Sequence, residues 1–195
     1  MGVEGAVSRV RFDLPRMPAE VAAVSRAVSR RKAEFITGRH CARQALKRIG
    51  VIATGPILKG KGGMPIWPDG VVGSISHTHE LVVAIAGRTG QIHAVGIDVE
   101  RVAELAWDVN AMVTAPGDAA FPVEALLEGS LRFACKEAAF KCWYVAGGAR
   151  IIEFSEARLE VSGNSFVATM PTPGPSRIEG RWVMENGHWW CVAWC

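Results

Sequence analysis

Residues 133–141 read FACKEAAFK, and the fold that we expect follows from the spacing in this segment. It belongs to a longer run, 126–145, whose apolar pattern predicts an α-helix that ends at the glycine pair 147–148. Phe133, Glu137 and Lys141 stand at i, i+4 and i+8, so they lie along one stripe of that helix. The apolar residues around the charged pair favour a packed helix. A surface salt bridge, worth about 0.3–0.5 kcal/mol, is the alternative interpretation of Glu137 and Lys141.

The same spacing occurs in the first third of the chain. Phe35, Arg39 and Arg43 repeat it within 19–49, a run of helix formers that predicts one or two helices and stops at Gly50. Three short strands are expected to follow and to form a small sheet, at residues 71–76, 81–86 and 94–99.

The last part of the chain predicts strands rather than helices. Alternating patterns mark strands at 151–154, 158–161, 166–170, 181–184 and 188–194. Asn186-Gly187 predicts a hairpin turn between the last two. We therefore predict an α+β fold with two pseudo-symmetric halves, each a helix packed on a small antiparallel sheet. Residues 1–100 are the predicted N-terminal half and 101–195 the C-terminal half.

Composition excludes several classes of protein. The 195 residues are 49% hydrophobic and 21% charged, which is typical of a globular protein of one or two domains. The longest aliphatic run, 81–86, is far shorter than the roughly 20 residues needed to cross a bilayer. With no leader pattern at the N-terminus, we expect a cytoplasmic protein. Five cysteines without a Cys-x-x-Cys pair predict reduced thiols and supply too few ligands for a structural zinc.

The charges are unevenly distributed along the chain. Residues 1–61 carry 13 basic and four acidic residues, a net charge of +9, whereas the remainder carries nine basic and 15 acidic residues, a net charge of −6. This asymmetry favours a protein that handles phosphates with one part and a metal cation with the other. A solvated basic helix face is one alternative. A basic nucleic-acid-binding module without catalysis is another, although the basic segment lacks interleaved aromatic residues.

An acidic pair follows the apolar residues 94–97. Asp98 and Glu100 are two positions apart on a predicted strand, so both carboxylates lie on one face. Mg²⁺ binds through a few carboxylates together with substrate phosphates. A solvent-facing acidic edge is the alternative. On the predicted helix, Glu137 could bind metal or take a proton, and Lys141 could stabilise a phosphate.

Residues 73–78, GSISHT, place hydroxyls and an imidazole at the end of a strand. A hydrolase triad is disfavoured because the Gly-x-Ser-x-Gly elbow is missing. His77 and His79 have no third ligand nearby for zinc. We therefore favour a phosphate contact for His77, and a core-capping histidine remains the alternative.

Taken together, these motifs resemble those of the 4′-phosphopantetheinyl transferases of the Sfp and EntD type. The resemblance rests on residues 63–78 (GMPIWPDGVVGSISHT), 96–100 (GIDVE) and 133–141, in the family's order. Residues 34–43 (EFITGRHCAR) resemble the EntD branch in particular. Residues 102–130 and 150–195 match no motif of the family.

The resemblance implies a monomeric enzyme of two similar α+β halves with its active site between them. Such enzymes transfer the 4′-phosphopantetheine group of coenzyme A to a serine of an apo acyl, peptidyl or aryl carrier protein and release 3′,5′-ADP. The reaction depends on Mg²⁺, with Mn²⁺ as a possible substitute. The resemblance leaves the pathway open among fatty acid, polyketide, nonribosomal peptide and siderophore biosynthesis, and neither a membrane nor a nucleic acid is an expected partner.

The resemblance also assigns roles to individual residues. Glu137, directly or through a bound water, would deprotonate the serine, and Lys141 would neutralise charge on the phosphates. Arg43 lies on the same helix stripe as Arg39, and this position fits a structural ion pair as well as it fits a contact with coenzyme A. The metal ligands implied are Asp98, Glu100 and Glu137, and the catalytic residues are Glu137, Lys141 and Asp98. The coenzyme A contacts implied are Arg31, Arg39, Lys59, Ser76, His77 and Lys141.

Overall fold

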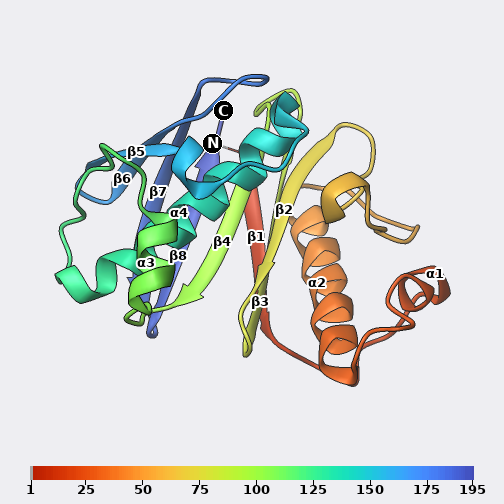
Figure 1. Cartoon of the computed structure of the whole chain (residues 1–195). Helices are drawn as coiled ribbons and strands as arrows, with labels where there is room; N and C mark the ends of the chain where they lie inside the picture. The colour runs from red at the N-terminus through yellow and green to blue at the C-terminus, as the bar shows by residue number, and fades with distance from the viewer. Residues whose placement is uncertain (1) are drawn as a thin grey trace. The chain divides into compact units, whose positions relative to one another are not determined.

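The structure is a computed structural model that describes residues 2–195, and the chain divides into two compact units, one ending at Ile92 and the other beginning at His93. Both units combine helices with an antiparallel sheet (Figure 1). The predicted α+β class is confirmed.

The first unit is built on a sheet of three strands, with a long helix against it. Its elements are β1 (Val3–Arg9), α1 (Pro18–Ala22), α2 (Ser29–Arg48), the 3₁₀ turn η1 (Lys61–Gly63), β2 (Val71–His77) and β3 (Leu81–Arg88). The strand order is β1-β3-β2, all antiparallel. The helix α2 packs against β1 and β3 through buried small and apolar residues, among them Ala42, Ala45 and Leu46.

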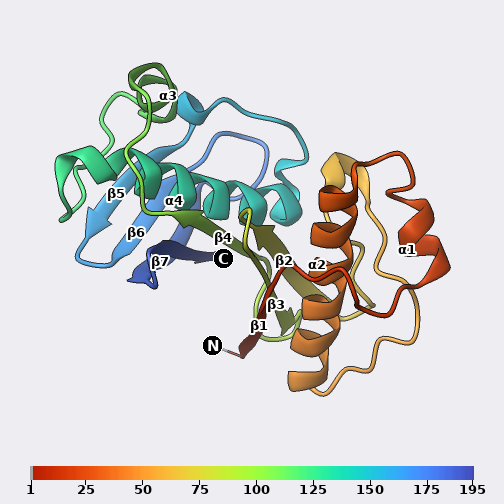
Figure 2. The same cartoon turned by 90° about the horizontal axis from the view of Figure 1, so that it is seen from below.

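The second unit holds a sheet of five strands in the order β4-β8-β7-β6-β5. Its strands are β4 (Val95–Arg101), β5 (Arg158–Ser162), β6 (Ser165–Thr169), β7 (Arg177–Glu185) and β8 (His188–Trp194). Its helical elements are α3 (Trp107–Val113), η2 (Ala125–Leu127), α4 (Glu128–Trp143), a π-helical turn η3 (Tyr144–Gly148) and η4 (Phe154–Glu156). Figure 2 shows α4 lying across this sheet.

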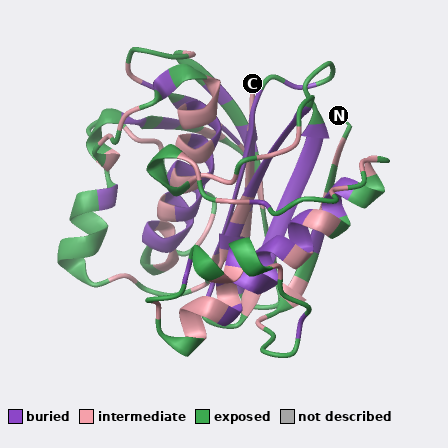
Figure 3. Ribbon diagram, turned by 90° about the vertical axis from the view of Figure 1, so that its right-hand side faces the viewer, coloured by how far each residue is buried: buried purple, intermediate pink, exposed green. Residues whose placement is uncertain are grey.

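The core of the second unit lies between α4 and its sheet. Leu131 and Trp143 of α4 are completely buried, as are Leu159 of β5 and Ile178 of β7. Many of the buried residues lie in strands, whereas most loop residues are exposed (Figure 3). Because α4 buries a face of small residues, the helix backbone comes close to the strands. No helix within residues 2–195 has the length and apolar character to span a membrane.

The structure differs from the sequence predictions at several elements. β4 pairs with β8 and not with β2 or β3, so the expected three-strand sheet of 71–99 is wrong. This pairing also puts β4 into the second unit, whereas the predicted halves divided at residue 100. Residues 151–154 form no strand, because Glu153 and Glu156 cap a 3₁₀ turn there.

Other predictions are confirmed, and two elements were not predicted. The hairpin at Asn186-Gly187 is present, with positive φ angles of 51° and 72° that suit these two residue types. The helices expected within 19–49 are α1 and α2, and the helix expected at 126–145 is α4. β1 and α3 were missed.

Candidate active site

A glycine in β4 allows the helix α4 to approach this strand closely. A Cβ atom at Gly96 of β4 would lie 2.7 Å from the backbone nitrogen of Cys142 and closer still to the carbonyl oxygen of Ala138. Real Cβ contacts are longer than this, so only glycine permits the approach of α4 to β4. Ala138 and Cys142 directly follow Glu137 and Lys141. The close approach therefore sets the position of both charged residues relative to β4.

Lys141 bonds to the strand through its ammonium group. Its Nζ donates a hydrogen bond of 2.6 Å to Oδ1 of Asp98 and one of 3.1 Å to the carbonyl oxygen of Ile97. The Asp98 side chain is only 4% exposed, whereas that of Lys141 is 26% exposed. The pair thus joins a buried carboxylate to a cation that still reaches solvent. Charge-assisted bonds of this kind are short and strong.

The other two carboxylates, Glu100 and Glu137, both have raised pKa values. Burial first, and then the charges of Asp98 and Glu137, raise the pKa of Glu100 to about 7, while Lys141 opposes the shift. Burial also raises the pKa of Glu137, against Lys141 and with Asp98. Asp98, Glu100 and Glu137 are therefore close enough for their charges to interact.

The donor chemistry of these three carboxylates fits a hard divalent cation, which takes oxygen ligands. A cation would also relieve the repulsion from Asp98 and Glu137 that adds to the effect of burial on the pKa of Glu100. Across residues 2–195, no three His, Cys, Asp or Glu side chains are grouped closely enough to hold a metal ion. The predicted ligand set therefore stays a prediction.

A second polar cluster lies in the first unit, where α2 begins and β2 ends. Nη1 of Arg31 donates a hydrogen bond of 3.2 Å to Oε2 of Glu34 and is also hydrogen-bonded to Nε2 of His77. Nδ1 of His77 lies 3.7 Å from the same Glu34 oxygen. Ser76, the residue before His77, is buried with 5% exposure. The predicted ligand contacts Arg31 and His77 are thus brought together, and Glu34 joins them.

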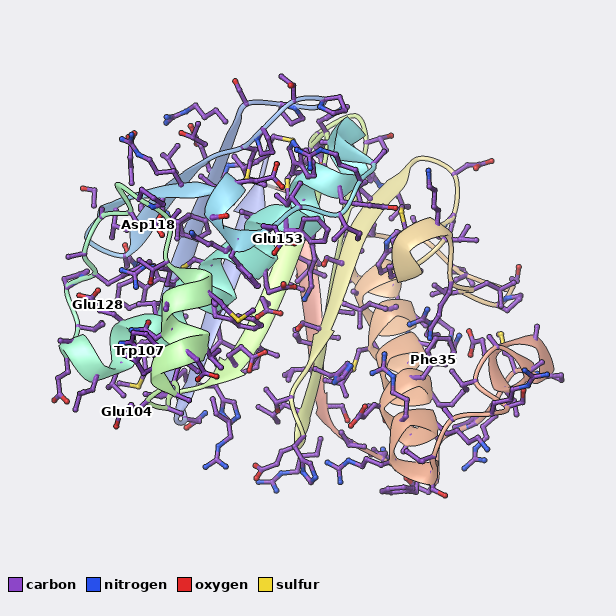
Figure 4. All side chains as sticks on the ribbon, viewed as in Figure 1. Phe35, Glu104, Trp107, Asp118, Glu128 and Glu153 are labelled. Atoms are coloured by element: carbon purple, nitrogen blue, oxygen red, sulfur yellow. The ribbon has the colours of Figure 1, made fainter. Side chains whose placement is uncertain are left out.

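Arg39 and Lys59 meet over an aromatic ring. The guanidinium carbon of Arg39 lies 3.7 Å from the centre of the Phe35 ring, and Nζ of Lys59 lies 5.1 Å from it (Phe35 is labelled in Figure 4). Nε of Arg39 donates a hydrogen bond of 2.9 Å to the carbonyl oxygen of Ile57. Cation–π contacts of this kind stabilise positive charge at a partly buried position.

The cations of the first unit repel one another. Burial lowers the pKa of Arg39 to about 10; Glu20 opposes this shift, while Arg31 and Arg43 contribute to it. The pKa of Lys59 is lowered by burial and then by the charges of Arg31 and Arg39. Three of the predicted coenzyme A contacts therefore form one positive cluster, which an anion would stabilise.

The partner of Arg43 shows that this residue forms a structural ion pair. Nη1 of Arg43 lies 2.6 Å from Oε1 of Glu20, a carboxylate with no solvent exposure. The same oxygen accepts a hydrogen bond of 3.0 Å from the backbone nitrogen of Ile57. Arg43 is therefore paired structurally, and the Glu20 pair holds the segment that leads to Lys59. No sequence pattern indicated Glu20, because its partners lie 23 and 37 residues away.

The helix α4 also has a buried ion pair that the sequence analysis did not predict. Nζ of Lys136 lies 2.8 Å from Oδ2 of Asp118 and donates a hydrogen bond of 2.9 Å to the carbonyl oxygen of Phe154. Asp118 also accepts hydrogen bonds from the backbone of Ala115 and Leu159 (Asp118 is labelled in Figure 4). The carboxylate thus joins α4, the 115–118 loop and β5. Lys136 stands in the motif 133–141, but Asp118 and its backbone partners Ala115 and Leu159 lie in stretches that match no motif.

The second unit holds buried and half-buried carboxylates beside a lysine, and the first unit holds crowded arginines. These features suit a protein that acts on a phosphorylated ligand with the help of a cation. Comparison with known proteins agrees. The family description "4'-phosphopantetheinyl transferase N-terminal domain" matches residues 19–87, within the first unit.

Three relatives cover most of the chain. It is 38% identical to the 4'-phosphopantetheinyl transferase Svp of Streptomyces mobaraensis, over 87% of this chain and 74% of Svp. Identity to PptT of Mycobacterium tuberculosis is 35%, over 89% of this chain and 83% of PptT. Identity to Npt of Nocardia iowensis is 34%, over 95% of this chain and 92% of Npt. The chain therefore belongs to the 4′-phosphopantetheinyl transferase family and is an enzyme of that class, as its motifs predicted.

Proposed function

We propose that this enzyme transfers the 4′-phosphopantetheine group of coenzyme A to a serine of an apo carrier protein. The observation that carries the proposal is the shared environment of Asp98, Glu100 and Glu137 beside Lys141, in a member of this family. In the reaction the serine Oγ forms a bond to the phosphorus that carries pantetheine. The bond from that phosphorus to the bridging oxygen breaks, and 3′,5′-ADP leaves.

Asp98, Glu100 and Glu137 would hold a divalent cation, Mg²⁺ or in its place Mn²⁺. When bound, this ion supplies positive charge against the pyrophosphate of coenzyme A. The carboxylates fit this use because the ion removes the repulsion among them.

Glu137 takes the proton of the serine, directly or through a bound water. A general base works best when its pKa is close to the working pH, and burial raises the pKa of Glu137 in that direction. Lys141 keeps Asp98 in place with its 2.6 Å bond and places a positive charge beside the phosphates as the transferred group leaves.

The first unit binds the nucleotide end of coenzyme A. Burial lowers the pKa values of Arg39 and Lys59, the charge of Arg31 lowers both further, and a phosphate beside these three cations would be stabilised by several charges at once. His77 lies against Arg31 at the end of β2, and Ser76 precedes it. These five residues are the proposed coenzyme A contacts of this unit, together with Lys141 of the second.

The proposed partners are acidic carrier proteins, which the net charge of +9 on residues 1–61 would attract. We place them in polyketide, nonribosomal peptide or siderophore synthesis, and we propose a cytoplasmic monomer. The alternative of a basic module without catalysis is set aside, because the chain belongs to an enzyme family.

Incubation with an apo carrier protein, coenzyme A and Mg²⁺ tests the proposal. Intact-mass measurement should find one added phosphopantetheinyl group per carrier, and 3′,5′-ADP should appear in equal amount. A carrier whose acceptor serine is replaced by alanine is the matched control. Failure to modify any apo carrier from the three pathway classes would contradict the proposed function.

A further inference from the structure

One carboxylate in the basic unit has no role in the proposed reaction. Glu34 of α2 has a side chain that is only 12% exposed, and three side chains surround it. Its Oε2 lies 3.2 Å from Nη1 of Arg31 and 3.7 Å from Nδ1 of His77, and its Oε1 lies 3.5 Å from Nε of Arg30. Two of these partners are helix neighbours, whereas His77 comes from β2.

A negative charge is unexpected in a cluster that binds phosphate. Glu34 lowers the positive potential around Arg31, so on charge alone it weakens the attraction for an anion. A surface helix pair with Arg30 or Arg31 needs no contact with β2. The contact with His77, 43 residues further along the chain, requires another explanation.

The geometry around Arg31 explains why Glu34 contacts His77. The Arg31 side chain is 43% exposed, and long flexible side chains lose conformational freedom when they bind a ligand. Glu34 and His77 both bond to its Nη1 atom, which fixes the guanidinium before the ligand arrives. The negative charge beside Nδ1 of His77 also favours a proton on that nitrogen, which leaves Nε2 to accept the hydrogen bond from Arg31.

We propose that Glu34 is a positioning residue that orients Arg31 and His77 for the phosphate groups of coenzyme A. This inference rests on the proposed function and adds a residue to it. Glu34 touches no reacting atom; it acts through the two side chains that it holds. The gain in orientation exceeds the loss in positive potential.

Removing the charge of Glu34 distinguishes this proposal from its alternatives, because each predicts a different change in the affinity for coenzyme A. Glu34→Gln keeps the shape of the side chain and removes its charge. If Glu34 positions Arg31, the variant should bind coenzyme A about tenfold more weakly, because charge-assisted bonds are lost. If Glu34 only repels the anion, binding should become tighter. If it only supports the fold, the melting temperature should fall and coenzyme A affinity should stay the same.

The measurements are calorimetric titration with coenzyme A and steady-state transfer to an apo carrier protein. The KM for coenzyme A should rise by the same factor as the dissociation constant, with kcat almost unchanged, since the lost contact affects ground state and transition state alike. Glu34→Asp retains the charge but is one methylene shorter, so it should lose the contact with His77 and give an intermediate affinity.

Two further variants complete the design. Glu80→Gln removes one charge from an exposed residue in the turn after His79, and coenzyme A affinity should change less than twofold from wild type. In a His77→Ala background, Glu34→Gln should cost much less than in wild type, because the two residues act on the same guanidinium. Full additivity of the two changes would contradict the inference.

The possible failures are distinguishable. If wild type transfers the group but Glu34→Gln binds coenzyme A as well as or better than wild type, the positioning role is wrong and the proposed function stands. If wild type neither binds coenzyme A nor modifies a carrier, the proposed function and the inference both fail.

Discussion

Replacement of Gly96 by alanine tests whether the distance between β4 and α4 creates the active site. The added Cβ would lie 2.7 Å from the Cys142 nitrogen, whereas ordinary contact begins at 3.4 Å. The helix must therefore move by at least about 0.7 Å, and further at the Ala138 carbonyl group, which is closer. Both neighbouring atoms belong to the backbone, so no side-chain rotation relieves the overlap.

The expected magnitudes follow from this displacement. Overpacking in a core costs about 1–3 kcal/mol, and a rigid backbone neighbour places Gly96→Ala at the upper end, near 3 kcal/mol. For a chain of this size each kcal/mol lowers the melting temperature by about 2–4 °C, which gives a drop of about 6–12 °C. A displacement near 1 Å at Glu137 and Lys141 should reduce kcat about 100-fold.

Thermal melting and a carrier-modification assay measure the two effects. Assays run well below the lowered melting temperature separate the loss of activity from unfolding. Gly90→Ala is the matched control, because a Cβ there meets nothing within 4 Å, and it should behave as wild type. A Gly96→Ala protein with the melting temperature and kcat of wild type would refute the reasoning.

Three further outcomes are expected. Asp98→Ala and Glu137→Ala should each reduce transfer by about 100-fold or more while circular dichroism stays native, and normal activity in both would exclude them from the site. Arg39→Ala should raise the dissociation constant for coenzyme A about tenfold, because a nearly buried cation is lost from the cluster, and an unchanged constant in calorimetry would remove Arg39 from it. The alkylation rate of Cys195 by iodoacetamide should rise with pH around a midpoint of about 7, since a hydrogen bond from Cys142 lowers the pKa of Cys195 to about 7 and only the thiolate reacts. Below that pH the thiol is protonated and the rate falls; in Cys142→Ala the midpoint should move up toward 9, and an unmoved midpoint would show that the hydrogen bond is not the cause.

Local patterns predicted most elements but not how the strands pair. The short apolar run at residues 94–99 predicted β4, yet its partner β8 begins 87 residues after the end of β4. Only the folded register, with Asp98 opposite Cys191, decides that β4 joins the second sheet. Long-range pairing of this kind depends on packing that no short window of sequence contains.

The charged residues of the candidate site could be predicted from sequence, whereas the buried carboxylates that anchor the surrounding elements could not. Asp98 and Glu100 share a strand face by simple alternation, and Glu137 and Lys141 share a helix face by spacing. By contrast, Glu20 and Asp118 act through partners far apart in the chain. Glu34 lies in the EntD-like segment 34–43, and its pairs with Arg30 and Arg31 are ordinary helix neighbours at i,i+4 and i,i+3. Its contact with His77 appears only in the structure.

Each unit holds like charges close together, which reduces the stability of the free protein. Burial and neighbouring carboxylates raise the folded pKa of Glu100 from 4.5 to about 7, so this residue reduces stability progressively as pH rises through that range. Burial and neighbouring arginines lower the folded pKa of Lys59, so its cost is fully present below that pKa and is lost as pH rises toward 10.5. Near neutral pH both costs are present in the free protein. Ligands of opposite charge remove them, and a ligand that binds only the folded state adds stability as its concentration exceeds its dissociation constant. On the proposed function, these charges are kept at a cost in stability because the ligands of opposite charge need them.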